Sequence, residues 1–257
     1  MRAEIDRSRM RFKELEYPIS LTLHQKSYLV APAQIDDSQD IRLIVFMGGN
    51  GMTAFDGIMW FMELRPYIES PTVKYAFLAV EYPGYGSNEG NPSPQSIHDS
   101  TVSAFDSALR CMTEEWDMRP VDMTVIGHSL GSAVATRWVA SGGSTKSIPV
   151  RKLILSAPFT SIADMASHIF GVPRLLSPLI SRHNWDTVKE LKSVIESDTV
   201  QEMIRIIHGT EDEIVPFRMG VELSKIDAGK IQLVPLKNMM HNNILDSYKV
   251  YAYAISE

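Results

Sequence analysis

The chain has 257 residues, of which 44% are hydrophobic and 22% are charged, so it is long enough to bury the core of one large globular domain. Its net charge of −6, without a long run of Lys or Arg, excludes the clustered basic surface that nucleic-acid binding needs. A single cysteine, Cys111, excludes a framework of internal disulfides.

The amino-terminal residues give the first indication of the compartment. Charges recur through residues 1–10 without an apolar core, which argues against a secretory signal. No apolar run in the sequence approaches the roughly 20 residues that cross a bilayer. We therefore expect a cytoplasmic protein with no membrane span, and we leave open its contact with the surface of a membrane.

An early segment differs in pattern from the rest of the chain. Ile19, Leu21 and Leu23 alternate with polar residues, and a second apolar run, 28–30, follows them. Alternation of this kind is typical of a strand with one buried face, so the segment 19–30 predicts an antiparallel hairpin at the edge of a sheet.

From residue 41 onward, short apolar runs alternate with segments of helical spacing. We predict strands over 41–47, 74–80, 121–126, 153–155, 203–207 and 231–236, and helices over 54–68, 96–112, 130–140, 217–226 and 243–255. This alternation is typical of βαβ units, and it predicts an α/β fold with a mostly parallel central sheet. Residues 158–202 interrupt the pattern with helical pieces, prolines and aromatics. We therefore expect one domain over 1–257, with 158–202 as a small helical cap inserted in it.

The predicted strand 121–126 leads into Gly127-His128-Ser129-Leu130-Gly131 and then a helix. This is the pattern G-x-S-x-G between a strand and a helix, which is typical of a nucleophile elbow. Glycine is needed two positions to either side of the serine because larger side chains would collide with the neighbouring strand and helix. Ser129 is therefore the candidate nucleophile. His128 faces the other way in such a turn, so we expect a structural role for it.

An acid and a base follow in the order that enzymes with this elbow use, namely Ser, then Asp or Glu, then His. Asp212 lies in the loop after the strand 203–207, and His241 lies beyond the end of the strand 231–236. Both positions are at the carboxyl ends of strands, where open α/β sheets place their ligands. Position within the loop favours Asp212, and Glu211 and Glu213 remain its rivals.

The linked motifs resemble those of the α/β-hydrolases, in particular the group that contains serine-aminopeptidase-like enzymes and small esterases and thioesterases. The resemblance spans roughly residues 40–255. It rests on Gly-Gly-Asn-Gly at 48–51, Glu-Tyr-Pro-Gly-Tyr-Gly-x-x-x-Gly at 81–90, Gly-His-Ser-Leu-Gly at 127–131, Ser-Ala-Pro-Phe-Thr-Ser at 156–161 and His-Gly-Thr-Glu-Asp at 208–212. Gly48 stands where the group often has a histidine that supports the oxyanion loop, and Glu81 stands where it often has aspartate.

This resemblance implies an α/β-hydrolase fold and a Ser129–His241–Asp212 triad. It also implies an oxyanion hole formed by the backbone N–H groups of Leu130 and of Asn50, with Gly51 as the alternative to Asn50. We expect the strand-end residues Gly49, Gly51 and Tyr82, and the cap residue Trp185, to contact the substrate. No metal site and no cofactor are expected, because neither metal-ligand spacing nor a dinucleotide-binding loop is found in the sequence.

Three functions remain open from the sequence. Apolar residues in 158–202 favour a small-molecule substrate with an apolar acyl group, joined through an ester or a thioester. A peptidase that acts on free amino termini would need an acidic group for the ammonium, and Glu81, Asp164, Glu211 and Glu213 are its candidates. The same fold also serves as a binding module in which catalysis is weak or lost.

Overall fold

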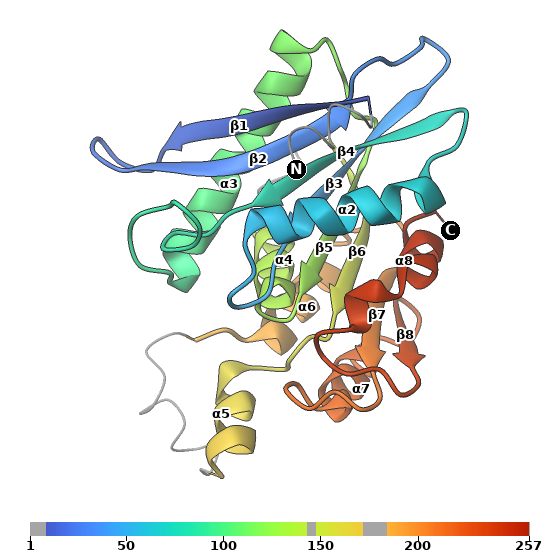
Figure 1. The fold of residues 1–257 in the computed structure, drawn as a ribbon. Helices are drawn as coiled ribbons and strands as arrows, with labels where there is room; N and C mark the ends of the chain where they lie inside the picture. Colours follow the sequence, from blue (N-terminus) through green and yellow to red (C-terminus); the bar gives the residue numbers. More distant parts are fainter. Residues whose placement is uncertain (1–8, 143–147, 172–183, 257) are drawn as a thin grey trace.

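The computed structural model describes residues 9–142, 148–171 and 184–256. Its eight strands form one sheet in the order β1-β2-β4-β3-β5-β6-β7-β8, and from β4 to β8 neighbouring strands are parallel (Figure 1). The strands are β1 (Met10–Pro18), β2 (His24–Pro32), β3 (Asp40–Met47), β4 (Val73–Val80), β5 (Met123–His128), β6 (Val150–Ser156), β7 (Ile204–Gly209) and β8 (Ile231–Leu236).

Helices cover both faces of this sheet because the side chains of a strand alternate between its faces and those of the central strands are buried on both. In β3, Leu43 and Val45 belong to one apolar cluster, whereas Ile44 and Phe46 belong to the other. The first cluster is closed by α3 (Pro94–Arg110), α4 (Leu130–Ala140), α6 (Thr187–Glu196) and α7 (Phe217–Ser224). The second is closed by α2 (Ala54–Ile68) and α8 (Tyr248–Ser256). The predicted mostly parallel sheet with helices on both faces is confirmed.

The edge hairpin exists, but its first strand was predicted in the wrong place. It consists of β1 and β2, which pair antiparallel from Met10 opposite Pro32 to Pro18 opposite His24. The alternating residues of the segment 19–30 include the turn between these strands, and Leu21 there is 103% exposed. The residues that β1 buries are Met10, Leu15 and Tyr17.

Two of the predicted helices differ in type and extent from the observed ones. The predicted helix 96–112 is α3, which is continued by a single π-helical turn, η1 (Cys111–Glu115). The predicted helix 243–255 is a 3₁₀ turn, η3 (Ile244–Asp246), followed by α8. At the carboxyl end of α8, Arg205 Nη1 donates to the Ala254 carbonyl at 2.6 Å and Lys152 Nζ to the Ile255 carbonyl at 3.1 Å. Cations at this end of a helix satisfy its free carbonyls and complement its dipole.

Within the predicted cap 158–202, the described residues form two helices, α5 (Ile162–Phe170) and α6. Helix α6 packs against α4 and therefore belongs to the layer that covers the sheet. Helix α5 lies below the carboxyl ends of the strands in Figure 1. The part of the predicted cap over residues 172–183 lies outside the described residues. No helix in the described parts of the chain combines the length and the apolar character that crossing a membrane requires.

Candidate active site

Ser129 occupies a sharp turn between β5 and α4. Its backbone has φ +53° and ψ −117°, a conformation that residues other than glycine rarely adopt. Two hydrogen bonds hold the turn: the Ser129 N–H donates to the Ser156 carbonyl at 2.8 Å, and the Ser132 N–H donates to the Ser129 carbonyl at 2.9 Å. The hydroxyl is thereby presented at the carboxyl edge of the sheet.

Two glycines allow the chain to pass through this turn. A Cβ on Gly127 would lie 2.2 Å from the carbonyl oxygen of Gly131, and a Cβ on Gly131 would lie 1.9 Å from the carbonyl oxygen of Met47. Neither approach leaves room for a carbon atom. The glycines of the sequence motif are therefore required by the contact of α4 with β5 and β3.

The structure brings Ser129, Asp212 and His241 together from three separate strand ends. His241 Nδ1 lies 2.8 Å from Asp212 Oδ2, and His241 Nε2 lies 2.9 Å from Ser129 Oγ. An ionised carboxylate only accepts hydrogen bonds, so Nδ1 carries the ring proton. The Nε2 lone pair is then free to accept the Ser129 hydroxyl.

The Asp212 carboxylate is held by four donors. Its Oδ1 accepts from the backbone N–H groups of Ile214 at 3.0 Å and Val215 at 2.7 Å, and Oδ2 lies 3.4 Å from His208 Nε2 besides its bond with His241. Burial by itself would raise the pKa of this carboxyl group. The hydrogen bonds from His208 and His241 outweigh burial and hold the Asp212 pKa well below its usual range.

The two rivals of Asp212 do not reach the imidazole ring by any hydrogen bond among the described residues. Glu213 Oε2 accepts the backbone N–H of His241 at 3.1 Å, and Glu211 is exposed. Asp212, which its position in the loop favours, is therefore the carboxylate that contacts the ring.

His128 lies on the inner side of the elbow and is buried. Its Nδ1 is 3.0 Å from Ser156 Oγ, which is in turn 2.6 Å from the Tyr251 hydroxyl. Burial, together with the neighbouring charge of His241, lowers the pKa of His128 to about 3. The His128 ring is therefore neutral across the physiological range. Its centroid lies 5.1 Å from that of the His241 ring.

His208, the fully buried penultimate residue of β7, was not identified from the sequence as a site residue. Its Nε2 lies 2.9 Å from the Val215 carbonyl, which can only accept, so Nε2 carries the proton. The same N–H faces Asp212, so His208 holds both ends of the turn 212–215. A histidine inside an apolar strand was the signal available in the sequence.

A pocket of about 420 Å³ opens beside Ser129. Its wall is mainly apolar, and five of its side chains come from the predicted cap segment. These are Phe159, Ile162, Met165, Ile169 and Trp185. Trp185 is only 5% exposed, so it belongs to the core and to the pocket wall at once.

The residues expected to form the oxyanion hole lie against this pocket. Leu130 is the first residue of α4, where backbone N–H groups have no partner within the helix, and it lines the pocket together with Asn50. Gly49 lies beside the candidate nucleophile: a Cβ on Gly49 would be 3.3 Å from the Cβ of Ser129. Gly51 has φ +81° and no atom near the position of a Cβ.

Tyr82 was predicted to contact the substrate, and the structure contradicts this. The side chain is 1% exposed, and its hydroxyl donates to the Gly48 carbonyl at 2.9 Å. Tyr85, three residues further on, lines the pocket instead. The tight turn between the two tyrosines sends the first inward and the second toward the pocket.

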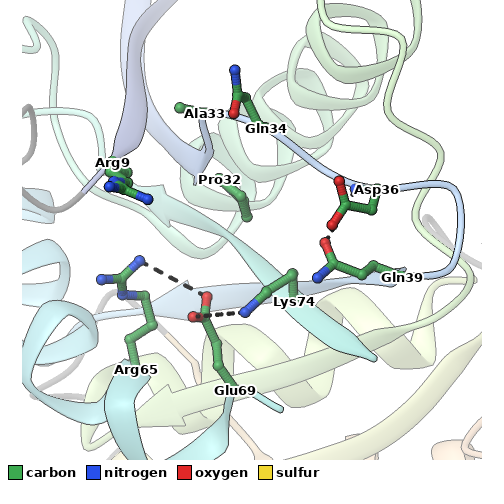
Figure 2. A pocket seen from close by; sticks show the side chains of 9 residues that line it. All are labelled: Arg9, Pro32, Ala33, Gln34, Asp36, Gln39, Arg65, Glu69 and Lys74. Atoms are coloured by element: carbon green, nitrogen blue, oxygen red, sulfur yellow. Dashed lines mark hydrogen bonds and ion pairs between the residues drawn. The ribbon is translucent and has the colours of Figure 1, made fainter. Parts of the chain in front are cut away.

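A second cavity, of about 670 Å³, lies at the opposite edge of the sheet, next to the amino ends of β3 and β4. Figure 2 shows Glu69 between Arg65 and Lys74, with ion-pair distances of 3.9 and 3.6 Å. The side chains that line it include no serine, cysteine or histidine. Among the residues that the structure describes, no group of three or more His, Cys, Asp or Glu could hold a metal ion.

Residues 44–223 match the model of a family described as "Alpha/beta hydrolase family". Over 181 residues the chain is 25% identical to the lysophosphatidylserine lipase ABHD12 of Danio rerio, covering 65% of this chain and 45% of that protein. The chain spans about half the length of the curated relatives it matches.

Solved structures share the fold. An alpha-beta hydrolase from Vibrio vulnificus superposes with a TM-score of 0.67 at 16% identity, over 98% of this chain and 81% of that one. The esterase Pf2001 of Pyrococcus furiosus superposes with a TM-score of 0.62 at 13% identity, over 100% of this chain and 93% of that one.

Proposed function

The chain belongs to the alpha/beta hydrolase family, and from this premise we propose that it is a serine hydrolase that cleaves esters or thioesters of apolar acyl groups. The observation that carries the proposal is the position of the His241 ring, with Nε2 2.9 Å from Ser129 Oγ and Nδ1 2.8 Å from Asp212 Oδ2. A nucleophile, a base and an orienting acid within hydrogen-bond reach are what acyl transfer through a covalent intermediate requires.

In the first half of the reaction, Ser129 Oγ attacks the acyl carbon while its proton passes to His241 Nε2. The tetrahedral oxyanion accepts hydrogen bonds from the N–H groups of Leu130 and Asn50. One such donor contributes about 3 kcal/mol to the stability of a transition state. The intermediate then expels the alcohol or thiol, which takes the proton from Nε2, and leaves the acyl group on Ser129.

The second half reverses these roles with water as the nucleophile. His241 takes a proton from water as the oxygen attacks the acyl-enzyme, and it returns that proton to Ser129 Oγ when the acid leaves. Asp212 keeps its negative charge throughout and stabilises the imidazolium form of His241.

The lining of the pocket supports an apolar acyl group as the substrate class. Apart from Ser129, its polar side chains are those of Asn50, Tyr85 and Ser93, and no carboxylate lies among the described lining residues. A volume of about 420 Å³ is within the range of small-molecule sites. The names of the relatives, among them a lipase and an esterase, agree with such a substrate.

A peptidase that acts on free amino termini finds less support. Glu81 is 2% exposed, and its Oε2 accepts the backbone N–H of Ala54 at 3.1 Å. Asp164 Oδ2 accepts hydroxyl bonds from Thr160 and Ser161, both at 2.7 Å. Neither carboxylate lines the pocket as a partner for an ammonium group.

The test is labelling with a fluorophosphonate probe, followed by p-nitrophenyl esters of graded chain length. We expect one adduct, on the peptide that contains Ser129, and hydrolysis that is faster for longer acyl chains than for acetate. An unlabelled wild-type chain that hydrolyses none of these esters would favour the binding-module alternative.

The pH dependence of hydrolysis is expected to show one ionisation on its acid side. A general base must be neutral to accept a proton, and histidine is the side chain whose charge ordinarily changes near neutrality, so a histidine base predicts activity that rises with pH. The pKa of Asp212 lies well below its usual range and that of His128 is lowered to about 3, so the charge on each stays constant above about pH 5. The measurement is kcat/KM from pH 5 to 9, and a flat profile would contradict a histidine base.

Trp185→Ala is expected to change the preference for acyl-chain length. The substitution shortens a side chain of the pocket wall and so enlarges the pocket. One methylene group of the substrate in such a pocket changes kcat/KM by about tenfold or more. The ratio of kcat/KM for long against short p-nitrophenyl esters should shift by about that factor. Because Trp185 is also buried, its loss should cost about 3–5 kcal/mol of stability.

Trp116→Ala is the matched control, since Trp116 lies at the end of η1, away from the pocket, and faces the Arg11 guanidinium at 5.8 Å. It should lower Tm without changing the chain-length ratio. The same result for Trp185→Ala would mean that the pocket wall does not select the acyl group.

A further inference from the structure

The proposed oxyanion donor Asn50 lies in a segment that is weakly constrained by its own hydrogen bonds. Residues 48–51, here called the glycine loop, contain three glycines, and glycine loses more conformational freedom on folding than any other residue. Within and next to this loop the described backbone bond is from the Met52 N–H to the Gly49 carbonyl, at 3.1 Å. The Gly49 N–H donates to the Met52 sulfur, a weak acceptor, at 3.3 Å.

Two phenol groups from the neighbouring segment hold the glycine loop. The Tyr85 hydroxyl donates to Asn50 Oδ1 at 2.6 Å. Burial raises the pKa of Tyr85, and the neighbouring Gly51 N–H partly offsets that rise. The Tyr82 hydroxyl donates to the Gly48 carbonyl at 2.9 Å. The loop is thus held at the Gly48 carbonyl and at the Asn50 side chain.

The segment that supplies these tyrosines, residues 81–90, is itself held by internal hydrogen bonds. Its own bonds run from the Tyr85 N–H to the Tyr82 carbonyl at 3.0 Å and from the Asn88 N–H to the Tyr85 carbonyl at 2.8 Å. Asn88 Nδ2 donates to the Glu81 carbonyl at 3.2 Å. The two rings meet edge to face with centroids 5.4 Å apart. Because these contacts fix the positions of the two tyrosines, their hydroxyls can impose one conformation on the glycine loop.

We propose that Tyr85 is a positioning residue that aims the backbone N–H of Asn50 at the oxyanion formed at Ser129, by holding the Asn50 side chain. The inference rests on the proposed function. In this chain Tyr85, with Tyr82, supplies support for a loop that begins with Gly48. An oxyanion donor must be correct in position to a few tenths of an ångström, because it binds the transition state and not the ground-state carbonyl.

Tyr85→Phe removes only the hydroxyl, and Tyr253→Phe, on an exposed ring of α8, is its matched control. We expect kcat of Tyr85→Phe on p-nitrophenyl esters to fall about 10- to 100-fold, less than the 10²- to 10³-fold loss when a donor is deleted. KM should change less than threefold, and Tyr253→Phe should resemble wild type. A raised KM with an unchanged kcat would make Tyr85 a substrate contact and overturn the inference.

An alkyl trifluoromethyl ketone, which forms a tetrahedral adduct with a serine, separates positioning from general damage. Its Ki should rise in Tyr85→Phe by the same factor by which kcat/KM falls, whereas the Ki of the product carboxylic acid should not change. Asn50→Ala keeps the backbone N–H but removes the bond to Tyr85. The double variant should therefore lose less activity than the product of the two single losses, and simple multiplication would overturn the coupling.

Hydrogen exchange distinguishes failure of this inference from failure of the proposed function. If wild type neither hydrolyses esters nor reacts with fluorophosphonate, the proposed function fails, and kcat, KM and Ki can no longer test the role of Tyr85. The amides of the glycine loop should still exchange faster in Tyr85→Phe than in Tyr253→Phe, because the hydroxyl holds the loop whatever its function. Equal exchange in the two variants would show that Tyr85 does not hold the loop.

Discussion

Ser129→Ala is expected to lower kcat on p-nitrophenyl esters by about 10⁴- to 10⁶-fold, the range found when the nucleophile of a triad is removed. The change deletes Oγ, so no acyl-enzyme can form and His241 loses the proton donor at 2.9 Å. What remains is the rate that binding and the oxyanion hole give to attack by water.

The fold of this variant should be intact. The backbone of the elbow keeps φ +53° in either residue, and the two backbone hydrogen bonds that hold the turn do not involve the hydroxyl. Tm should therefore stay within a few degrees of wild type. Ser224→Ala on α7, with a hydroxyl that bonds only the Val221 carbonyl at 2.9 Å, should keep full activity. Near-wild-type turnover by Ser129→Ala would refute the nucleophile.

Gly131→Ala is expected to destabilise the fold through a backbone clash. The added methyl group would lie 1.9 Å from the Met47 carbonyl oxygen and 2.7 Å from that of Gly48. These are backbone atoms of β3 and its loop, so a side-chain rotation cannot relieve the clash, and α4 must separate from the sheet. Overpacking a core costs about 1–3 kcal/mol when side chains can adjust, so we expect about 3 kcal/mol or more here.

For a domain of this size, that loss corresponds to a decrease in Tm of about 6–12 °C. Thermal unfolding followed by circular dichroism measures it. Gly229→Ala is the control, because Gly229 is exposed and a Cβ there would meet only the side-chain oxygen of Asp227, at 3.2 Å. A Gly131→Ala protein with wild-type Tm would mean that α4 does not approach β3 as described.

The parts of the fold that were predictable are those whose pattern is local. Helix α4 was predicted with the observed bounds, because a glycine motif marks its start and Gly142-Gly143 marks its end. The strands β3 and β4 are apolar runs that are buried on both faces. The start of the hairpin was wrong because alternation does not reveal which face will find a partner. Residues 19–23 alternate but form a turn, whereas Tyr17 is buried against α3 through its bond with Ser100, at 3.1 Å.

The three residues of the proposed triad could be identified because their order and their places at strand ends follow from the elbow. Side-chain direction could not be obtained in this way. Tyr82 and Tyr85 lie in the same predicted loop, and the sequence does not distinguish their directions. The turn between them decides which one lines the pocket beside Ser129. His208 was missed because its role depends on the Val215 carbonyl, which the loop brings back beside it.

The separation of Ser129 from His241 has a consequence for when the protein becomes active. They are 112 residues apart in sequence, and β6 and β7 must be in place between β5 and β8 before the two side chains can meet. At synthesis rates of about 5–20 residues per second, the serine leaves the ribosome roughly 6–20 s before the histidine does. Pairing of distant strands is also a slow step of folding. Under the proposed mechanism, the Ser129 hydroxyl of the nascent chain is therefore inert, and it becomes reactive only when β8 joins the sheet.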